Sequence, residues 1–156
     1  MKMILAVVVI ACVVFYFYSN FSNNKAAVAN IEQGAAFLAD NKLREGVITT
    51  PSGLQYEYLV NADGEQHPKA TDTVTVHYHG TLLDGTVFDS SVERGQSIDF
   101  PLNRVISGWT EGVQLMTVGD KVRFYIPSTL AYGNRSAGKI APGSTLIFDV
   151  ELLAIN

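Results

Sequence analysis

The sequence contains a single cysteine, Cys12, among 156 residues. Because Cys12 lies in an apolar N-terminal run, the rest of the chain has neither a thiol nucleophile nor a thiolate metal ligand, and an internal disulfide is excluded. Positive charge is also scarce, with 11 Lys and Arg against 15 Asp and Glu and a net charge of −4 at pH 7. No basic cluster stands out, which argues against a nucleic-acid partner.

Several catalytic motifs are missing as well. The sequence has no Gly-x-Ser-x-Gly nucleophile motif and no phosphate-binding loop. Ser90 and Ser91 follow Asp89, but no histidine is placed to activate them. His77 and His79 lie two residues apart on an expected strand, but no clear third metal ligand follows. Covalent and metal-assisted catalysis are therefore disfavoured, and nothing in the sequence suggests a metal or a cofactor.

Polar residues are absent from residues 3–18, which follow Lys2. A soluble core helix of this length normally keeps a polar face. Sixteen helical residues span about 24 Å, slightly less than a bilayer core of about 30 Å. A positive charge before such a segment favours the cytoplasmic side for the N-terminus, so the C-terminal part is expected outside the cytoplasm.

Three interpretations of this segment remain open. Residues 1–21 form a signal anchor that stays in the membrane, or a secretory signal cleaved after the A-x-A-like site Ala27-Val28-Ala29. A lipoprotein signal is the third, because Val9-Ile10-Ala11-Cys12 resembles a lipobox. All three export the rest of the chain, which is expected in a bacterial cell envelope, either anchored facing the periplasm or free in the periplasm.

Residues 22–46 are interpreted as a spacer and a short helix. Residues 19–30 are polar and small, which is typical of a spacer. Asn30 is a suitable helix N-cap and Gly46 a suitable stop, so a helix is expected from Ile31 to about Glu45. The folded domain is then expected to occupy residues 47–156.

The stretch from Val74 to Asp89 is the most informative part of that domain. Val74, Val76 and Tyr78 alternate with polar residues, as in a strand with one buried face. Gly80 indicates a bulge, and Asp84-Gly85 is a strong hairpin signal. A hairpin here brings Tyr78, Phe88 and Asp89 together, either as the wall of an apolar pocket with a polar group or as an ordinary core hairpin.

The remaining segments complete an α+β pattern. Strands are expected over residues 54–60, 121–127 and 144–155, and a helix over 105–116, where apolar residues recur at helical spacing. A Gly-rich loop covers 128–142. Together with the hairpin, this gives about five strands and one short internal helix, hence an antiparallel sheet wrapped on a helix.

Four motifs, taken together, resemble a known family. They are the hairpin, the Val105-Ile106-x-Gly-Trp109 helix start, the Ala131-Tyr132-Gly133 loop and the final strand with Phe148-Asp-Val-Glu-Leu. From about Val47 to Ile155 the chain resembles FKBP-type peptidyl-prolyl cis-trans isomerases, and the preceding segment is similar to bacterial envelope members related to the macrophage infectivity potentiator. The resemblance implies a strongly twisted, five-stranded antiparallel sheet around one short helix. Those envelope members dimerise through a long helical region, which is short here, so a homodimer stays open.

The resemblance also implies a set of site residues. The catalytic residues would be Tyr78, Phe88, Asp89, Trp109 and Tyr132, and the substrate-binding residues Arg94, Ile98, Val105, Ile106, Ile140 and Phe148. Trp109 would form the pocket floor, and Asp89 would pair with Arg94. Ile98 replaces an aromatic wall residue that many members have, and the loop over 134–141 appears one residue short; both departures suggest a wider or weaker pocket.

The implied activity is acceleration of X-Pro bond rotation in exported proteins by non-covalent binding. The alternative is a non-catalytic peptide-binding or chaperone module on the same fold. Proline-containing polypeptides are the expected partners, rapamycin-like macrolides are further ligands implied by the resemblance, and the N-terminal segment would contact the membrane.

Overall fold

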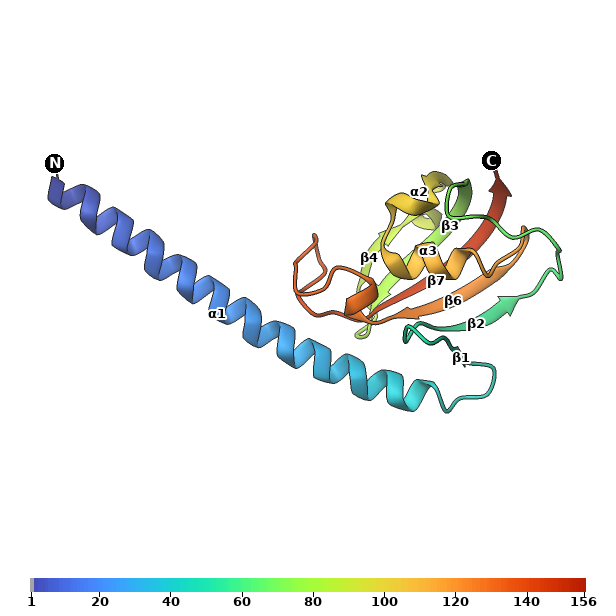
Figure 1. Cartoon of the computed structure of the whole chain (residues 1–156), viewed down its shortest axis with the longest axis horizontal. Coiled ribbons are helices and arrows are strands. Elements are labelled where there is room, and N and C mark those ends of the chain that lie inside the picture. Colours follow the sequence, from blue (N-terminus) through green and yellow to red (C-terminus); the bar gives the residue numbers. More distant parts are fainter. Residues whose placement is uncertain (1) are drawn as a thin grey trace.

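The computed structural model describes residues 2–156, with side chains from residue 6 onward; Met1 and the Lys2 charge that sets the predicted orientation lie outside this part. A long helix, α1 (Lys2–Asn41), precedes a curved sheet that wraps around the short helix α3 (Ser107–Val113). Figure 1 shows the first half of α1 extending away from this domain. The predicted α+β architecture with an N-terminal apolar helix is confirmed.

The sheet is antiparallel throughout, in the order β1-β2-β6-β7-β3-β4, with β5 pairing with β3 beside it. Its strands are β1 (Ile48–Thr49), β2 (Gln55–Val60), β3 (Thr73–Leu82), β4 (Val87–Ser90), β5 (Ile98–Pro101), β6 (Lys121–Ile126) and β7 (Leu146–Ile155). The short strands β1 and β5 raise the number from the expected five to seven. The start of β3 pairs with β5 and its end pairs with β4, so two short strands share the edge of β3 that does not pair with β7.

The core lies between the concave face of the sheet and α3. Alternate side chains of β3, β6 and β7 are fully buried, as the alternation in the sequence predicted. A helix of seven residues is marginal alone, so its packing on the sheet holds it in place. A Cβ on Gly112 would lie 2.5 Å from the Phe124 ring, so the missing side chain lets α3 approach β6 closely.

Two expected elements differ in extent. The helix expected over 105–116 begins only at Ser107, because residues before it form the 3-10 turn η1 (Leu102–Arg104) and an extended link. In the strand expected over 54–60, the predicted buried face holds at Leu54, just before β2, whereas Tyr58 and Val60 in β2 are exposed. The only neighbour of β2 on that side is the two-residue β1, so the far end of β2 stays at the sheet edge.

The polar segment 19–30, interpreted from the sequence as a spacer, has a regular conformation. It is helical, so the apolar run and the predicted helix after Asn30 merge into one helix that ends at Asn41. Gly46 follows in a turn with φ +85° rather than directly ending the helix. Small and polar residues there are compatible with a helix because neighbouring helical turns on both sides propagate it.

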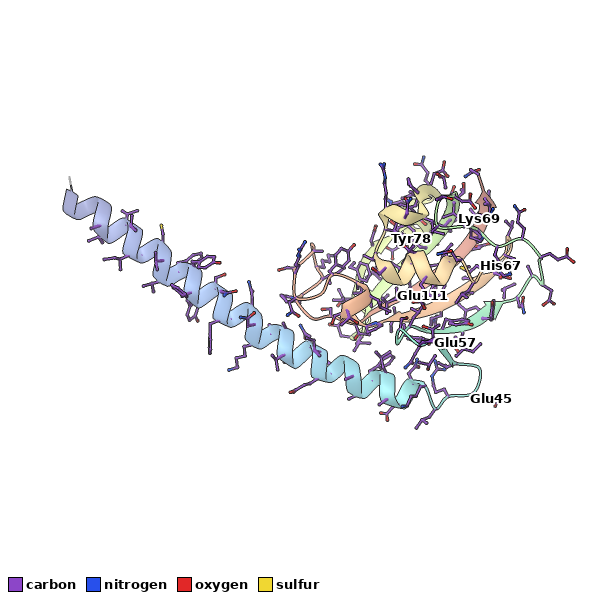
Figure 2. The ribbon with its side chains drawn as sticks, in the orientation of Figure 1. Glu45, Glu57, His67, Lys69, Tyr78 and Glu111 are labelled. Carbon is purple, nitrogen blue, oxygen red and sulfur yellow. The ribbon has the colours of Figure 1, made fainter. Side chains whose placement is uncertain are left out.

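The second half of α1 packs against the domain. The Asn30 side chain donates to the Pro142 carbonyl at 2.8 Å, and the Asn41 side chain donates to Gln55 Oε1 at 2.9 Å. The Phe37 ring lies 5.8 Å from that of Tyr125. Just beyond the helix, Arg44 forms an ion pair with Glu57, which Figure 2 labels beside the end of α1. The helix is therefore docked on the domain rather than tethered by a flexible segment.

Among residues 6–18, the part of the first half whose side chains the structure describes, no side-chain hydrogen bond or ion pair to the domain is found and every residue is exposed. Within Ala6–Asn41, an 18-residue window is long and apolar enough to cross a membrane, and none of that window is buried. A cleaved signal sequence would satisfy the same test.

Candidate active site

The hairpin between β3 and β4 forms one wall of a cavity. Gly85 adopts φ +87°, and Leu82 and Thr86 join the strands through a 2.9 Å backbone hydrogen bond, so the predicted turn at Asp84-Gly85 is confirmed. The predicted bulge is also present, as a register shift directly after Gly80. A Cβ on Gly80 would lie 2.6 Å from Phe88 and 2.8 Å from Phe148. Glycine at this position therefore allows the two rings to pack, with centroids 5.2 Å apart.

Trp109, at the start of α3, is the centre of an aromatic cluster. The rings of Tyr78, Phe100 and Phe148 have centroids 5.4, 5.5 and 5.3 Å from that of Trp109, and each is nearly perpendicular to it. Edge-to-face pairs of this kind add about 0.5–1.5 kcal/mol each beyond the burial of their area. Trp109 is thus held by three rings that come from three different strands.

These rings surround an open cavity of about 620 Å³, within the range of small-molecule binding sites. Its lining is Tyr78, Phe88, Asp89, Phe100, Arg104, Val105, Ile106, Trp109, Tyr132, Ala137, Ile140 and Phe148. Figure 2 labels Tyr78 in the region where β3, α2 (Ser91–Arg94) and α3 come together. The lining is mostly apolar, with a few polar groups at its edge.

One polar cluster borders the cavity. The Tyr78 hydroxyl donates to Asp89 Oδ2 at 2.5 Å, and Arg94 donates to the Tyr78 hydroxyl at 3.0 Å and forms an ion pair with Asp89. Arg94 is carried by α2, a single helical turn that Ser90 caps by accepting from the Glu93 N–H at 3.2 Å.

The cluster sets the charge state of its members. Partial burial alone would raise the pKa of Asp89, but the hydrogen bonds from Tyr78 and Arg94 outweigh it and hold that pKa below its usual range. Burial, followed by the hydrogen bond to Asp89, raises the pKa of the Tyr78 hydroxyl. At neutral pH Asp89 is therefore an ionised acceptor and Tyr78 a neutral donor, and neither is poised to exchange a proton.

Three donors at the cavity have no acceptor among the described residues. The indole Nε1 of Trp109 is buried and unpaired, a situation that costs about 1–3 kcal/mol in a closed core. The Tyr132 hydroxyl, in a residue that is 40% exposed, and the Ile106 N–H take part in none of the hydrogen bonds found in residues 2–156. The site can therefore donate hydrogen bonds to an incoming molecule.

The structure brings together nine of the eleven residues singled out in the sequence. Ile98 and Arg94 are not part of the lining: Ile98 packs partly buried opposite Val76, and Arg94 lies behind Asp89 and Tyr78. Phe100, which shares a strand face with Ile98, lines the cavity instead. The pocket therefore keeps an aromatic wall here, contrary to the expected loss.

Sequence reasoning missed Phe100, Arg104 and Ala137 as lining residues. The two-residue alternation within 98–101 was a signal for Phe100, since it places that ring on the same side as Ile98. For Arg104 no local pattern was available, because its position depends on the 3-10 turn η1. Ala137 reaches the site because it pairs with Ile140 in a tight turn of the Gly-rich loop.

The histidines form no metal site in the part of the chain that the structure describes. His77 Nδ1 lies 2.9 Å from Ser91 Oγ, and His79 Nδ1 lies 2.8 Å from Ser90 Oγ. Among these residues there is no group of three His, Cys, Asp or Glu side chains that could hold a metal ion. Contrary to the expectation that no histidine lies near Ser90 or Ser91, each serine hydroxyl contacts a histidine, and these contacts connect β3 to the segment that begins α2.

Comparison with known proteins decides the family. Residues 64–153 match the family model described as FKBP-type peptidyl-prolyl cis-trans isomerase, which is more than half of the chain. The chain belongs to the FKBP family. Residues 17–57 match a second model, described as the domain amino-terminal to FKBP-type peptidyl-prolyl isomerases. This second match covers the docked half of α1 and the first strands of the sheet.

Named relatives support this placement. The chain is 58% identical over 133 residues to FKBP-type peptidyl-prolyl cis-trans isomerase FkpA of Aeromonas hydrophila, covering 85% of this chain and 49% of that protein. It is 47% identical over 134 residues to outer membrane protein MIP of Legionella longbeachae, covering 85% of this chain and 57% of that protein. The chain thus spans about half the length of these relatives.

A solved structure gives the same result for the FKBP fold. The crystal structure of FkpA from Escherichia coli superposes with a TM-score of 0.84 at 39% identity, covering 94% of this chain and 71% of that chain. This coverage includes most of α1, so the long helix ahead of the FKBP domain has a counterpart in that structure.

Proposed function

We propose that this FKBP is a peptidyl-prolyl cis-trans isomerase that acts on proline-containing segments of exported proteins. The observation that carries the proposal is the cavity of about 620 Å³ around Trp109, with aromatic walls and unpaired donors at its edge. The names of its relatives point to the same activity, although the chain spans only part of their length.

The reaction needs no bond to be made or broken. An X-Pro bond rotates over a barrier of about 18–20 kcal/mol and takes tens to hundreds of seconds unaided. The planar amide owes its double-bond character to a charge-separated resonance form, which an apolar enclosure stabilises less than water does. The twisted state carries less of this charge separation, so a largely dry aromatic pocket lowers the barrier by binding that state better.

Each group of the site has a role in this proposal. Trp109 and Phe88 grip the proline ring, while Phe100 and Phe148 complete the apolar enclosure. The Ile106 N–H and the Tyr132 hydroxyl hold carbonyls on either side of the rotating bond, which confines rotation to that bond. Asp89 acts as neither acid nor base; with Arg94 it holds Tyr78 in the wall, which its lowered pKa supports.

The N-terminal helix carries the second part of the proposal. We assign the exposed apolar half of α1 to a membrane, as an anchor that holds the FKBP domain on the outer side of the cytoplasmic membrane. The full exposure of this half within the described chain supports that assignment. Cleavage as a secretory signal is the alternative, and the mass of the mature protein recovered from cell membranes distinguishes the two.

The activity is tested with the full chain in a mild detergent, by following cis-to-trans relaxation of a Leu-Pro peptide at low temperature. The account expects acceleration in proportion to enzyme concentration, weakened in Tyr132→Phe, which removes only the hydroxyl. A rapamycin-like macrolide that fits the same cavity should compete with the peptide. If the folded protein binds the peptide without accelerating its relaxation, the alternative of a peptide-binding module replaces the proposal.

A further inference from the structure

Arg104 lies at the edge of the pocket and is not used by the mechanism described above. It comes from η1, is exposed, and lines the cavity beside Val105 and Ile106. Within residues 2–156 its guanidinium has neither an ion pair nor a hydrogen bond to another side chain. It is therefore a positive charge at the mouth of an apolar pocket without a partner in the described chain.

Two more positive charges lie on the loop across the cavity. Ala137 and Ile140 both line the pocket and pair with each other through hydrogen bonds of 2.9 and 2.8 Å. Arg135 precedes Ala137 and Lys139 precedes Ile140 in the same short loop. Both are exposed and form no ion pair among the described residues, and they lie next to lining residues without lining the cavity themselves.

The cavity lining contributes no unpaired negative charge. Asp89 is the only acidic lining residue, and it is paired with Arg94. Asp99, on the opposite face of β5 from the lining residue Phe100, accepts a hydrogen bond from Thr75 at 2.7 Å. Glu93, the other nearby acid, belongs to α2 and does not line the cavity. The pocket mouth is thus positively charged, although the chain as a whole carries −4.

A charged pocket mouth discriminates among polypeptides that carry the same proline. The proline ring and the residue before it enter the apolar cavity, whereas residues one or two positions further out pass over its edge. Exposed charges at such distances interact by about 0.2–1 kcal/mol, and the interaction is screened by salt. Complementary charge at an interface also steers encounter.

We propose that Arg104, together with Arg135 and Lys139, selects client segments that carry Asp or Glu within two residues of the isomerised X-Pro pair. This inference rests on the proposed function, because it assigns a substrate class to the same pocket. The expected preference is about two- to five-fold in kcat/KM for an acidic over a basic residue at that position, the size that exposed ion pairs produce.

The test uses the full chain in detergent and a series of Leu-Pro peptides that differ only in one flanking residue, Glu, Gln or Lys, placed before or after the pair. At about 10 mM salt the order Glu over Gln over Lys is expected, and it should converge near 1 M salt, where the screening length falls to roughly 3 Å. Arg104→Glu should bring the Glu-to-Lys ratio close to one, because Arg135 and Lys139 remain, and Arg104→Lys should largely retain the wild-type ratio.

Lys121→Glu is the matched control. It makes the same change of charge at an exposed position away from the pocket. Lys121 is the first residue of β6, and the loop that carries Tyr132 and Ile140 follows the opposite end of that strand. It should leave the Glu-to-Lys ratio unchanged. Equal kcat/KM for the Glu and Lys peptides at low salt, or an unaltered ratio in Arg104→Glu, would overturn the inference.

Failure of the proposed function can be told apart from failure of this inference. The Gln peptide reports isomerisation without a flanking charge, so its acceleration tests the proposed function alone. Binding of the same three peptides, labelled and followed by fluorescence anisotropy, reports the charge preference even if no peptide is accelerated. A charge preference in binding without acceleration would support the cationic mouth and refute the isomerase.

Discussion

The molecule exposes apolar side chains in two regions, and they differ in shape. On the first half of α1, Val7, Phe15 and Tyr18 are 66%, 73% and 72% exposed, on a convex helical surface with no contact to the domain. In the pocket, Trp109 is only 4% exposed and sits at the base of a cavity with donors at its edge. Both regions are apolar, but only the pocket has a concave shape that can enclose a small chemical group such as a side-chain ring.

The shape of each surface determines what it can bind. A convex apolar cylinder offers no hydrogen bond and no enclosed volume, so it suits a partner without fixed shape, such as lipid hydrocarbon. A concave site with a few donors suits a particular ring in a particular orientation. Both surfaces present apolar side chains, and their geometry separates what they can bind.

The length of α1 links the two regions. Forty helical residues extend about 60 Å, roughly twice the hydrocarbon thickness of a bilayer. With the apolar first half in the membrane, the second half rises from it and docks on the domain through Asn30 and Asn41. We therefore expect the domain to be held at a defined distance from the membrane surface.

Removing the ring of Phe88 should have the largest effect on the pocket and none on the helix. Phe88→Ala opens the wall that faces Phe148, so kcat/KM for a Leu-Pro peptide should fall by tenfold or more, as each lost 1.4 kcal/mol of transition-state binding costs a factor of ten. Phe37→Ala, which removes a ring between α1 and β6, is the matched control and should retain most activity. Equal losses in both variants would mean that Phe88 acts through stability alone.

A charge in the first half of α1 should weaken membrane binding and leave the activity of the pocket unchanged. Val9→Lys places an ammonium group within the apolar run, at a cost of about 2.5–3.5 kcal/mol near the centre of a membrane helix. The protein should shift from the membrane to the soluble fraction, and its isomerisation rate should persist. Asn24→Lys, beyond the apolar run, should stay membrane-bound. Unchanged membrane retention of Val9→Lys would argue against this half of α1 as the anchor.

The Asp89 cluster should give a pH-dependent stability of moderate size. The pKa of the Asp89 carboxyl is lower in the folded than in the unfolded chain. Its contribution to the free energy of unfolding is therefore fully present above the unfolded pKa of about 3.9 and disappears as the pH falls through the folded pKa. Asp89→Asn should lower Tm at pH 7 by about 2–4 °C, the equivalent of the 1 kcal/mol at most expected of an exposed ion pair.

Comparing the same two proteins at lower pH tests the expected direction of this pH dependence. Near pH 3 the difference in Tm between wild type and Asp89→Asn should shrink, because this pH lies below the unfolded pKa and the unfolded chain then takes up a proton at Asp89. Glu65→Gln, at an exposed position in a loop, should lower Tm little at either pH. A difference for Asp89→Asn that grows as the pH falls would contradict the lowered pKa.

The smallest expected effect concerns the contact between the second half of α1 and the domain. Asn30→Ala removes the hydrogen bond to the Pro142 carbonyl, which is worth about 0.5–1.5 kcal/mol. Amide hydrogen exchange in residues 141–145 should become faster, while exchange in β3 stays unchanged. Asn24→Ala, which removes an exposed Asn from the same helix, is the control. Equal exchange in both variants would show that Asn30 does not hold this loop.

Local patterns predicted the hairpin well because its signals are contained in its own residues. Tyr78, Phe88 and Asp89 were expected together from alternation and from Asp84-Gly85 alone, and they line one cavity. The family resemblance extended this to Trp109 and Tyr132, which are distant in sequence and meet only through the fold.

The features that the sequence did not predict depend on interactions that no local pattern contains. Residues 19–30 are weak helix formers by composition, but they continue a helix that is already formed on both sides. Phe100 rather than Ile98 lines the cavity because the pairing of β5 with β3 sets how far along the pocket each side chain reaches. Arg104 enters the site through a 3-10 turn whose position is decided by packing.

The exchange rate of a proline peptide separates a catalyst from a binding module. Exchange spectroscopy by NMR, on a Leu-Pro peptide with a small amount of the full chain in detergent micelles, reports both the cis-trans exchange rate and the cis-to-trans ratio at equilibrium. The account predicts faster exchange at an unchanged ratio, since a catalyst lowers the barrier without moving the equilibrium. Binding at the Trp109 indole N–H with an unchanged exchange rate would contradict the account and identify a binding module.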